Sequence, residues 1–515
     1  MECFIKQWCD FFDLIKKNDI VNPIKNIRIM NIMELSKEQQ IAFNKYVHGN
    51  NIFITGPGGS GKSELIRMIY KDAYSQLKNI QVTAMTGCAS ILLNCKAKTL
   101  HSWSGIGLGN VTTEQIISKI KKNKFAKGMW KSTDILVVDE ISMLSLKLFN
   151  MLNDIGKAIR GNLKPFGGIQ LIFSGDFYQL PPVGNKDEPE TQQFCFESNE
   201  WNSVFNRECQ IELVKIFRQT NEDYCSILNQ IREGKIKRRS NDLLLQYVGR
   251  KFDKDLVAEP TKLYPTKNKV EQINVSKMSV LNSDEKEFKI KHIKDLVISK
   301  NDRIKRNDFT DKEVLFELEF LSGNLMCDKE IKLKIGAQVM CIINIKSETN
   351  DDMIICNGSQ GIITDFCEVT GLPRVKYNNG VDMTMSRHTW ESDKIPGIGV
   401  SQVPLILSWA LTIHKSQGST LDAAEIDVGS GIFECGQTYV ALSRVKDLKG
   451  LYLTSFDANK IRINKKVKEY YESLKTYYTT KKTEPVVCIE NPFQKFEYED
   501  ETPEIKNDIK IIKLG

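Results

Sequence analysis

A glycine-rich octapeptide from Gly56 to Ser63 limits the possible folds of this chain more than any other segment. It follows an apolar run over 51–55 and precedes a helical pattern over 64–70. Glycines let successive backbone N–H groups converge on phosphate oxygens, and the N-terminus of the following helix adds its positive dipole. Lys62 can then reach the β- and γ-phosphates, and Ser63 can ligate Mg²⁺. The residues predicted to bind a nucleotide here are Gly56, Pro57, Gly58, Gly59, Ser60, Gly61, Lys62 and Ser63.

Short apolar runs, separated by turns and amphipathic helices, continue on both sides of this loop. Runs that alternate with helices in this way indicate parallel sheets in an α/β fold. Between two sets of runs, residues 283–400 are β-rich and contain turns such as Asn357-Gly358 and Asn379-Gly380, which predicts a small inserted barrel or sandwich. The first set lies at 52–54, 80–85, 135–138 and 169–173, and the second at 262–264, 424–428 and 451–453.

Two polar segments follow predicted strands of the first set. Asp139-Glu140 comes directly after the run at 135–138, and Gln179 follows the run at 169–173. Ligands bind at the carboxyl ends of parallel strands, so Asp139 is expected to hold Mg²⁺, Glu140 to polarise an attacking water and Gln179 to contact the γ-phosphate. An acidic pair at a strand end can also be purely structural. The preceding phosphate loop favours the catalytic interpretation.

Composition narrows the class of protein without identifying it. The formal net charge of +7 over 515 residues is compatible with nucleic-acid binding but too weak to establish it. The thirteen cysteines include no Cys-x-x-Cys pair and the five histidines are scattered, which favours reduced thiols over disulfides or a zinc site. The longest apolar run, 403–413, is shorter than the ~18 residues that a membrane span needs. We therefore expect a soluble intracellular protein.

Motif after motif then resembles the PIF (petite integration frequency) family of DNA helicases, in the RecD-like branch of superfamily 1B. The resemblance covers about residues 34–460, in the family's order. The segments that carry it are Leu35-Ser36-Lys37-Glu38-Gln39, Thr86-Gly87-Cys88-Ala89, 99–109, 165–177, Phe217-Arg218-Gln219, 409–418 and 436–444.

The resemblance implies an α/β fold with two RecA-like P-loop NTPase lobes, a small wedge insertion and an inserted SH3-like β-barrel. On this sequence, lobe 1A spans 33–190 and carries wedge 1B around 100–132. Lobe 2A comprises 191–282 and 401–480, and the inserted domain 2B comprises 283–400. Residues 1–32 form an N-terminal extension, expected to dock on the body or to bind a partner, and residues 481–515 form a flexible tail.

The implied activity is that of a DNA-stimulated, ATP-dependent DNA helicase that moves 5′ to 3′ on single-stranded DNA, in replication, repair, recombination or telomere maintenance. The implied cofactors are ATP and Mg²⁺, with the metal held by Ser63 and Asp139. Gln39 is expected to read adenine and Gly418 to contact the nucleotide. The expected partners are single-stranded DNA and tailed or forked duplex DNA, bound by a monomeric motor that contacts no membrane. The implied catalytic residues are Lys62, Glu140, Gln179 and two arginine fingers, Arg218 and Arg444.

The same resemblance implies a track of contacts to single-stranded DNA, in which hydroxyls and amides meet phosphates and aromatic rings stack on bases. Trp103 is expected either to stack on a base or to be a core aromatic, and His101 either to contact phosphate or to be a structural histidine. The lysine-rich stretch 119–131 is either a solvated helix face or a duplex contact beside the wedge. The predicted DNA contacts are Thr86, Gly87, His101, Ser102, Trp103, Thr412, His414 and Lys415.

Two other activities stay open on these residues. An ATP-switched single-strand-binding or nucleoprotein-remodelling module would use every one of them without unwinding duplex. A phosphoryl-transferring kinase would instead need an acceptor site in place of Gln179, Arg218 and Arg444. The expected location is the nucleus in a eukaryotic cell, with a viral replication site or a mitochondrion as alternatives.

Overall fold

The computed structural model describes residues 35–93, 95–107, 112–252, 257–296, 309–346, 353–392 and 395–481. The predicted N-terminal extension over 1–32 and the predicted tail beyond residue 481 lie outside these residues. The chain forms two compact units, Met1–Arg462 and Ile463–Gly515, and the second contains the helix α15 (Lys465–Lys481). The second lobe, predicted to run to residue 480, is therefore divided after Arg462. None of the helices among the described residues is long and apolar enough to cross a membrane.

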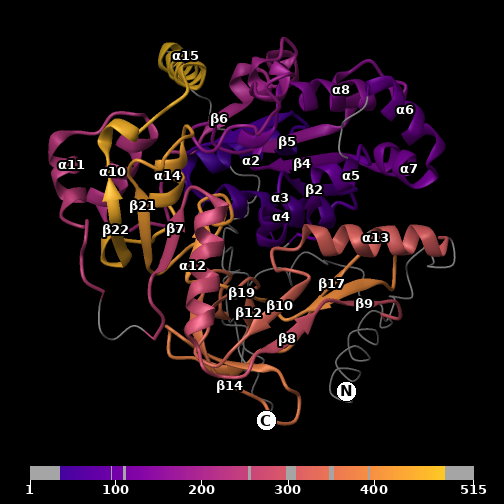
Figure 1. Ribbon diagram of the computed structural model, residues 1–515. Helices are drawn as coiled ribbons and strands as arrows, with labels where there is room; N and C mark the ends of the chain where they lie inside the picture. Colours follow the sequence, from indigo (N-terminus) through magenta and orange to yellow (C-terminus); the bar gives the residue numbers. More distant parts are fainter. Residues whose placement is uncertain are drawn as a thin grey trace, which may run out of the picture. The chain divides into compact units, whose positions relative to one another are not determined.

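The first sheet is parallel and has the strand order β3-β2-β4-β5-β1-β6 (Figure 1). The four apolar runs of the first predicted set form its central strands. The short strand β6 pairs with β1, with Ile211 opposite Ile54, so the sheet continues past residue 190, where lobe 1A was predicted to end. The strands are β1 (Ile52–Thr55), β2 (Ile80–Ala84), β3 (Lys98–Thr99), β4 (Ile135–Asp139), β5 (Gln170–Ser174) and β6 (Gln210–Glu212).

Alternate side chains of the central strands pack against helices on opposite faces of this sheet. Ile52 and Ile54 join a buried cluster with residues of α2 and α3, whereas Phe53 between them contacts Trp201. This alternation explains why the runs are apolar throughout, because both faces of each strand are covered. The helices are α2 (Lys37–Val47), α3 (Lys62–Ser75), α4 (Gly87–Leu93), α8 (Leu146–Arg160) and α9 (Trp201–Val204).

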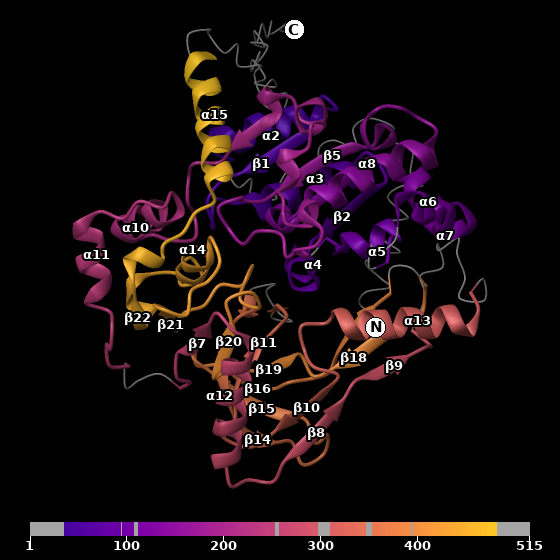
Figure 2. The ribbon, with the colours of Figure 1, turned by 45° about the horizontal axis from the view of Figure 1, so that its top comes forward.

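Three short helices occupy the segment predicted as the wedge: α5 (Leu100–Ser104), α6 (Thr113–Lys122) and α7 (Lys124–Ser132). Thr112 and Asn123 cap the N-termini of α6 and α7 with their side chains. In both ribbon views α13 (Asp311–Asn324) lies beside α5 and α7, and Phe125 of α7 contacts Phe309 with ring centroids 6.1 Å apart (Figures 1 and 2). The wedge segment therefore touches the inserted domain.

The second sheet is also parallel, in the order β20-β7-β21-β22. All three runs of the second predicted set form strands in it. Tyr224 donates a hydrogen bond to the Leu442 carbonyl at 2.7 Å, which joins α10 to α14. The strands are β7 (Thr261–Tyr264), β20 (Ala410–Thr412), β21 (Ala424–Val428) and β22 (Leu451–Phe456), and the helices are α10 (Glu222–Arg232), α11 (Arg238–Leu245), α12 (Lys267–Val280) and α14 (Gln437–Leu442).

The inserted segment is β-rich, as expected, and consists of small antiparallel sheets plus α13. It continues to residue 407, past the predicted boundary at 400, because β19 pairs with β11, with Ile406 opposite Met340. The second lobe resumes with β20. The strands are β8 (Lys286–Lys289), β9 (Lys291–Ile293), β10 (Glu330–Leu333), β11 (Gln338–Cys341), β12 (Ile345–Lys346), β13 (Met353–Ile355), β14 (Gln360–Phe366), β15 (Pro373–Tyr377), β16 (Asp382–Thr384), β17 (His388–Glu391), β18 (Gly399–Gln402) and β19 (Leu405–Leu407).

Candidate nucleotide site and DNA track

The predicted functional residues collect at the carboxyl ends of parallel strands. The phosphate loop follows β1, Asp139 ends β4 and Gln179 follows β5, and these strands are neighbours in the order β4-β5-β1. Thr86-Gly87 follows β2 and His101 follows β3, on the other side of β4. The strand order therefore separates the predicted nucleotide residues from the predicted DNA contacts along one edge of the sheet.

The phosphate loop has a backbone that favours glycine. Gly59 and Gly61 both have φ of +83°, in the left-handed region. A Cβ on Gly59 would lie 2.5 Å from Cβ of Arg218, and one on Gly61 would lie 2.5 Å from Nε2 of Gln39. Both glycines are thus required for the conformation of the loop and for the close approach of side chains packed on it.

Lys62, the first residue of α3, turns its ammonium group back onto the loop. Nζ donates hydrogen bonds to the carbonyl oxygens of Gly56, at 2.7 Å, and of Pro57, at 3.0 Å. Burial lowers the pKa of Lys62, and the nearby carboxylates, chiefly that of Asp176, oppose this shift. The hydroxyl of Ser60 is buried and has no hydrogen-bond partner among the described residues. Phosphate oxygens are acceptors for both donors, so the loop fits a nucleoside triphosphate.

The acidic pair lies beside this loop. Burial raises the pKa of Asp139 to about 6, and the neighbouring Glu140 carboxylate adds to the shift. The backbone of Glu140 is left-handed, with φ 57° and ψ 40°, a strained conformation of the kind that clusters at functional sites. Its Oε2 accepts a hydrogen bond of 3.0 Å from Nε2 of Gln417, which also lies 3.5 Å from Oε1 of Gln179. Gln417, missed by the sequence analysis although it precedes Gly418, therefore connects the second lobe to both catalytic candidates.

Two arginines that follow β6 in the chain contribute to the same site. Arg218 donates from Nη1 to the carbonyl of Ser443 at 3.3 Å, and Arg444 donates from Nη2 to the Ser443 hydroxyl at 2.9 Å. Burial lowers the pKa of Arg218 to about 10, with repulsion from Arg444 as the next cause, so Arg218 stays cationic at neutral pH. Burial also lowers the pKa of Arg444.

Two aromatic residues that sequence reasoning missed also belong to this site. Tyr439 of α14 accepts a hydrogen bond from the backbone N–H of Gly58 at 2.8 Å, which ties the second lobe to the phosphate loop. Phe217 is 46% exposed and lines the same cavity as Arg218. Phe217 could have been predicted to belong to the site, because it precedes Arg218 in a segment that carries the family resemblance. An exposed ring in a nucleotide cavity offers a face on which a base can stack.

Gln39 is already engaged within the protein. Its Oε1 accepts from the backbone N–H of Ser36 at 2.9 Å, and its Nε2 donates to the carbonyl of Gly61 at 3.3 Å. These bonds close a capping box at the start of α2 and brace the phosphate loop. Each end of the amide keeps one further hydrogen-bonding position, so a contact with adenine does not require either bond to be exchanged.

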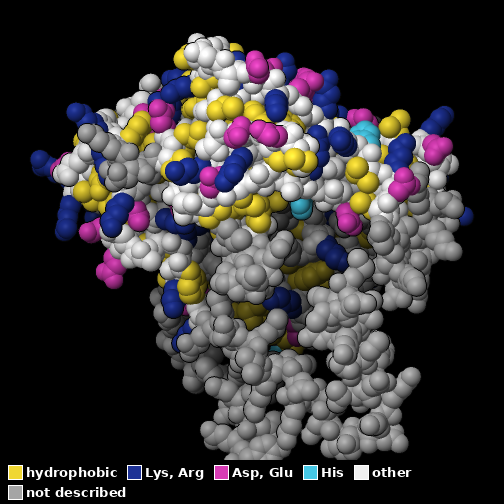
Figure 3. Space-filling model, turned by 90° about the horizontal axis from the view of Figure 1, so that it is seen from below, with side chains coloured by type: hydrophobic (Ala, Val, Ile, Leu, Met, Phe, Trp, Pro, Cys, Tyr) yellow, Lys and Arg dark blue, Asp and Glu magenta, His cyan; other side chains and the backbone are white. Residues whose placement is uncertain are grey.

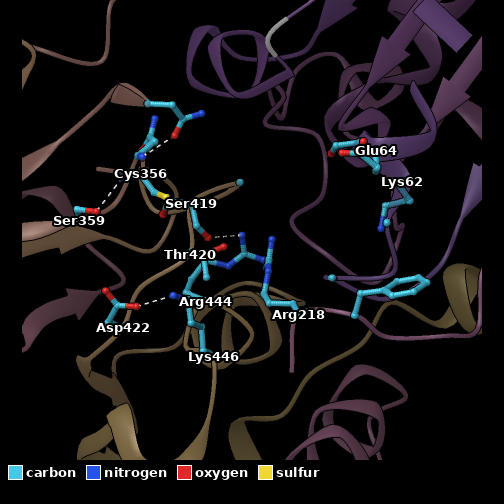
Figure 4. A pocket seen from close by; sticks show the side chains of 18 of the residues that line it. Lys62, Glu64, Arg218, Cys356, Ser359, Ser419, Thr420, Asp422, Arg444 and Lys446 are labelled. Atoms are coloured by element: carbon cyan, nitrogen blue, oxygen red, sulfur yellow. Dashed lines mark hydrogen bonds and ion pairs between the residues drawn. The ribbon is translucent and has the colours of Figure 1, made fainter. Parts of the chain in front are cut away.

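A cavity of about 700 Å³ joins these groups, with Lys62 on one wall and Arg218 and Arg444 across from it (Figure 4). Gly56 and Pro57 act through the carbonyls that hold Lys62. The predicted site residues that line the cavity are Gly58, Gly59, Ser60, Gly61, Lys62, Ser63, Asp139, Glu140, Gln179, Arg218, Gly418 and Arg444.

The donors present also fit Mg²⁺. Among the described residues no group of three or more His, Cys, Asp or Glu side chains could hold a metal by itself. Mg²⁺ needs no such group, because it binds through one or two protein oxygens together with substrate phosphates and water. Ser63 and Asp139 both line the cavity beside the phosphate loop and offer a hydroxyl and a carboxylate.

The predicted DNA contacts of the second lobe follow β20. The Lys415 side chain is exposed, and its backbone N–H donates to the hydroxyl of Thr412 at 3.1 Å. His414 is partly buried, and burial lowers its pKa, which favours the neutral ring at physiological pH. Lys415 is the exposed basic side chain of this segment.

The predicted DNA contacts of the first lobe sit at the starts of two helices. The Thr86 hydroxyl accepts from the N–H of Ala89 at 3.2 Å, and Gly87 opens α4. His101 and Ser102 lie in α5, where both side chains are partly buried. Burial lowers the pKa of His101, so a neutral ring is favoured here as well.

Trp103 does not present a face for base stacking. Its side chain is 2% exposed and packs on Trp130 of α7, with ring centroids 4.5 Å apart. The indole N–H of Trp130 donates to the carbonyl of Ser104 at 2.9 Å, which fixes the pair between α5 and α7. The stacking prediction for Trp103 is therefore wrong for this conformation, and the alternative of a core aromatic holds.

The lysine-rich stretch lies on the outer faces of α6 and α7. Lys119 and Lys131 are exposed, whereas Ile116, Ile120 and Trp130 point inward and are buried. On the face shown in Figure 3, lysine and arginine side chains are interspersed with acidic ones. The described part of that face therefore carries no broad basic surface.

Comparisons with known proteins agree with this arrangement. The family model described as PIF1-like helicase matches residues 34–242, and that of the DNA helicase Pif1 2B domain matches residues 318–366. The chain is 33% identical over 522 residues to the ATP-dependent DNA helicase RRM3 of Saccharomyces cerevisiae, covering 86% of this chain and 68% of that protein. It is 32% identical to the ATP-dependent DNA helicase PIF1 of Homo sapiens, covering 88% and 66%. The chain spans less than two thirds of some curated relatives, such as 64% of PIF1 from Danio rerio.

Solved structures show the same similarity. The crystal structure of Pif1 helicase from Candida albicans aligns with a TM-score of 0.67 at 33% sequence identity, covering 86% of this chain and 100% of that one. A Bacteroides Pif1 in complex with ADP-AlF4 aligns with a TM-score of 0.68 at 28% identity, covering 86% and 98%. Another Bacteroides Pif1, bound to single-stranded DNA, aligns with a TM-score of 0.57 at 28% identity, covering 87% and 98%.

Proposed function

The chain belongs to the family of PIF1-like helicases, and we propose that it is an ATP-dependent DNA helicase that moves 5′ to 3′ along single-stranded DNA and unwinds tailed or forked duplex DNA. The observation that carries this proposal is that Arg218 and Arg444 line one cavity with the phosphate loop and lie close to it: a Cβ on Gly59 would lie 2.5 Å from Cβ of Arg218, and one on Gly58 would lie 3.7 Å from Nη2 of Arg444. A site built from segments so far apart in the chain is complete only while the lobes are together.

Each side chain then has a role that follows from its position. Lys62 neutralises the β- and γ-phosphates, and Ser63 and Asp139 hold Mg²⁺, which supplies further charge neutralisation when bound. Glu140 orients and deprotonates the attacking water. Gln417 of the second lobe donates a hydrogen bond to the Glu140 carboxylate, so a movement of that lobe would change the position of the carboxylate. Arg218 and Arg444 stabilise the charge that develops in the transition state.

The domain roles belong to the same proposal. The segment around 100–132 would act as wedge 1B, and the inserted β-rich segment, as an SH3-like domain 2B, would form the other wall of the strand channel. Support comes from the contact of Phe125 with Phe309, which brings these parts together. Thr86, Gly87, His101, Ser102, Thr412, His414 and Lys415 would form the strand track. The motor would act as a monomer on DNA in a nucleus, a mitochondrion or a viral replication site.

Unwinding of duplexes with a 5′ or a 3′ single-stranded tail, in the presence of ATP and Mg²⁺, tests the proposal. Strand separation should occur on the 5′-tailed duplex and not on the 3′-tailed one, and the Lys62→Ala variant should separate neither. DNA-stimulated ATP hydrolysis without strand separation on either duplex would contradict the helicase activity. That outcome would favour the ATP-switched single-strand-binding or remodelling module, which uses the same cavity.

A further inference from the structure

The segment that follows β20 carries a proposed DNA contact and also lies against the proposed catalytic groups. It comprises residues 412–419, at the carboxyl end of that strand. Lys415, a predicted DNA contact, has an exposed side chain, whereas Gln417, two positions later, is only 8% exposed. The two side chains therefore leave the segment for different surroundings, one in solvent and the other inside the protein.

Hydrogen bonds within this segment fold it into a tight turn. The backbone N–H of Ser416 donates to the carbonyl of Thr412 at 3.1 Å, and that of Gln417 donates to the carbonyl of His414 at 3.2 Å. The hydroxyl of Thr412 also accepts from the N–H of Lys415 at 3.1 Å. Bonds between residues three or four apart fix the backbone of a turn, so a displacement of Lys415 also displaces Gln417.

The side-chain amide of Gln417 lies against the general base of the proposed mechanism. Its Nε2 donates to Oε2 of Glu140 at 3.0 Å and lies 3.5 Å from Oε1 of Gln179. Among the described residues, no other group donates a hydrogen bond to the Glu140 carboxylate. Hydrogen bonds to an ionised acceptor are stronger than those between neutral groups, so this one amide has a large share in holding the carboxylate in place.

The same turn also contacts one of the proposed arginine fingers. Arg444 donates from Nη1 to the carbonyl of Ser419 at 3.4 Å (Figure 4). The N–H of Ser419 donates to the carbonyl of Ser416 at 3.1 Å, so this contact belongs to the hydrogen-bonded turn. One short segment therefore joins an exposed lysine to the groups proposed to act on the water and on the phosphates.

A purely structural role for Gln417 would be to hold the two lobes together. Other contacts already do so, among them the buried ion pair of Arg232 with Asp176 and the hydrogen bond from Gly58 to Tyr439. Loss of a contact that only joins the lobes would change nucleotide affinity or stability. Loss of a contact that aligns the base would change the rate of the chemical step, so the two roles predict different kinetics.

We propose that Gln417 is a positioning residue, through which single-stranded DNA bound at Lys415 sets the position of the Glu140 carboxylate for hydrolysis. The inference rests on the proposed function and adds to it a route by which DNA stimulates ATP hydrolysis. DNA that holds Lys415 fixes the turn, the turn fixes Gln417, and Gln417 aligns the base with the attacking water. In this role Gln417 needs no contact of its own with ATP or with DNA.

The first test removes the donor of Gln417 and keeps the length of its side chain. At saturating single-stranded DNA, Gln417→Met should lower kcat for ATP hydrolysis by about 10- to 100-fold, the loss expected for a hydrogen bond to a charged group. The KM for ATP and the affinity for single-stranded DNA should stay unchanged. Gln246→Met, at an exposed amide after α11, is the matched control and should change none of these quantities. An unchanged kcat in Gln417→Met, with or without a higher KM, would overturn the inference.

The second test asks whether Gln417 acts through Glu140. In a Glu140→Gln chain the base is already lost, so the addition of Gln417→Met should not lower the residual single-turnover rate any further. Such non-additivity is expected only of residues that act as a unit. A further loss in the Glu140→Gln chain as large as the loss in the wild-type chain would show that Gln417 acts elsewhere, and would overturn the inference.

The third test concerns the DNA. Lys415→Ala should lower the maximal stimulation of ATP hydrolysis even at saturating single-stranded DNA, and it should cause no further loss of stimulation in a Gln417→Met chain. Equal losses of stimulation in both chains would show that DNA acts by another route, and would overturn the inference. DNA-stimulated hydrolysis by the wild-type chain, with full activity in Gln417→Met, would leave the proposed function standing. Absence of hydrolysis in the wild-type chain would remove both.

Discussion

Arg232 of α10 forms a two-pronged ion pair with Asp176, which follows β5 of the first lobe: Nε lies 2.9 Å from Oδ2 and Nη2 lies 3.0 Å from Oδ1. The Arg232 side chain is 4% exposed and that of Asp176 is fully buried. Glu212 of β6 lies 3.2 Å from Nη1 of the same guanidinium. Since Asp176 is three residues before Gln179, this pair joins the second lobe to the segment that carries a catalytic candidate.

Removal of the guanidinium should destabilise the protein strongly. Arg232→Met takes the guanidinium away from the buried carboxylate of Asp176, and loss of one member of a buried pair costs about 3–5 kcal/mol. The double variant Arg232→Met with Asp176→Asn should recover part of that loss, because it also removes the buried negative charge. Urea unfolding would measure the free energy of unfolding of the single and the double variant. Arg374→Met, in an exposed pair with Asp382, is the matched control and should cost less than about 1 kcal/mol. A similar loss of unfolding free energy in Arg232→Met and Arg374→Met would contradict the assigned role of the buried pair.

Glu140→Gln should separate binding from hydrolysis. The amide keeps the size of the side chain but cannot deprotonate water, so we expect ATP and single-stranded DNA to bind while hydrolysis falls by ~10²–10⁴-fold. Lys62→Ala should weaken both nucleotide binding and turnover, because its ammonium lies on the phosphate loop, where it would contact the phosphates in the ground state and in the transition state. Equilibrium binding of ATP and steady-state hydrolysis distinguish the two variants. Near-wild-type hydrolysis in both would refute the assignment of this site.

Arg218→Ala should remove the stimulation of ATP hydrolysis by single-stranded DNA. The guanidinium stays charged at neutral pH despite its lowered pKa, and it lines the cavity at the phosphate loop. An arginine finger contributes ~10³–10⁵ in rate, so the DNA-stimulated rate should fall by at least ~10³-fold with little change in ATP affinity. Hydrolysis measured with and without single-stranded DNA checks this. Full stimulation in the variant would show that Arg218 does not act on the transition state.

Sequence patterns predicted the parts of the fold that depend on neighbouring residues. The phosphate loop and Asp139 follow from a motif and from apolar runs that are local, and both parallel sheets formed where those runs lie. The domain boundaries at 190 and 400 failed because they depend on which strands pair. Ile211 opposite Ile54, and Ile406 opposite Met340, join segments far apart in the chain. No periodicity in the sequence encodes such pairing.

The same difference between local and long-range information applies to individual site residues. Glu140, Arg218 and Arg444 were predicted from motifs; all three line one cavity, and their catalytic roles stay predictions. The Arg232–Asp176 pair was missed, because a salt bridge between residues 56 positions apart leaves no pattern in the sequence. Trp103 was ambiguous, since an aromatic residue in a helix can stack on a base or fill a core. Only its packing on Trp130 decides between the two.

Trp103→Ala should therefore act on stability and not on the strand track. Removal of a buried tryptophan leaves a cavity between α5 and α7, and such changes cost about 3–5 kcal/mol. Trp103→Phe fills part of that space and should cost less. Thermal or urea unfolding measures both, and single-stranded DNA affinity should be unchanged at temperatures where the variants are folded. A stable Trp103→Ala variant that has lost DNA affinity would restore base stacking as the role of this residue.

Lys415→Ala tests the strand track itself. Lys415 is exposed and follows β20, where the track is proposed to cross the second lobe. A lysine that neutralises one phosphate of a single strand releases condensed counterions, so its loss should reduce the slope of log K against log salt by ~0.7. Titrations with single-stranded DNA at several salt concentrations measure that slope. Lys235→Ala removes an exposed lysine after α10, outside the proposed track, and should leave the slope unchanged. An equal change in both variants would show that Lys415 acts through the overall charge of the protein and does not contact the strand.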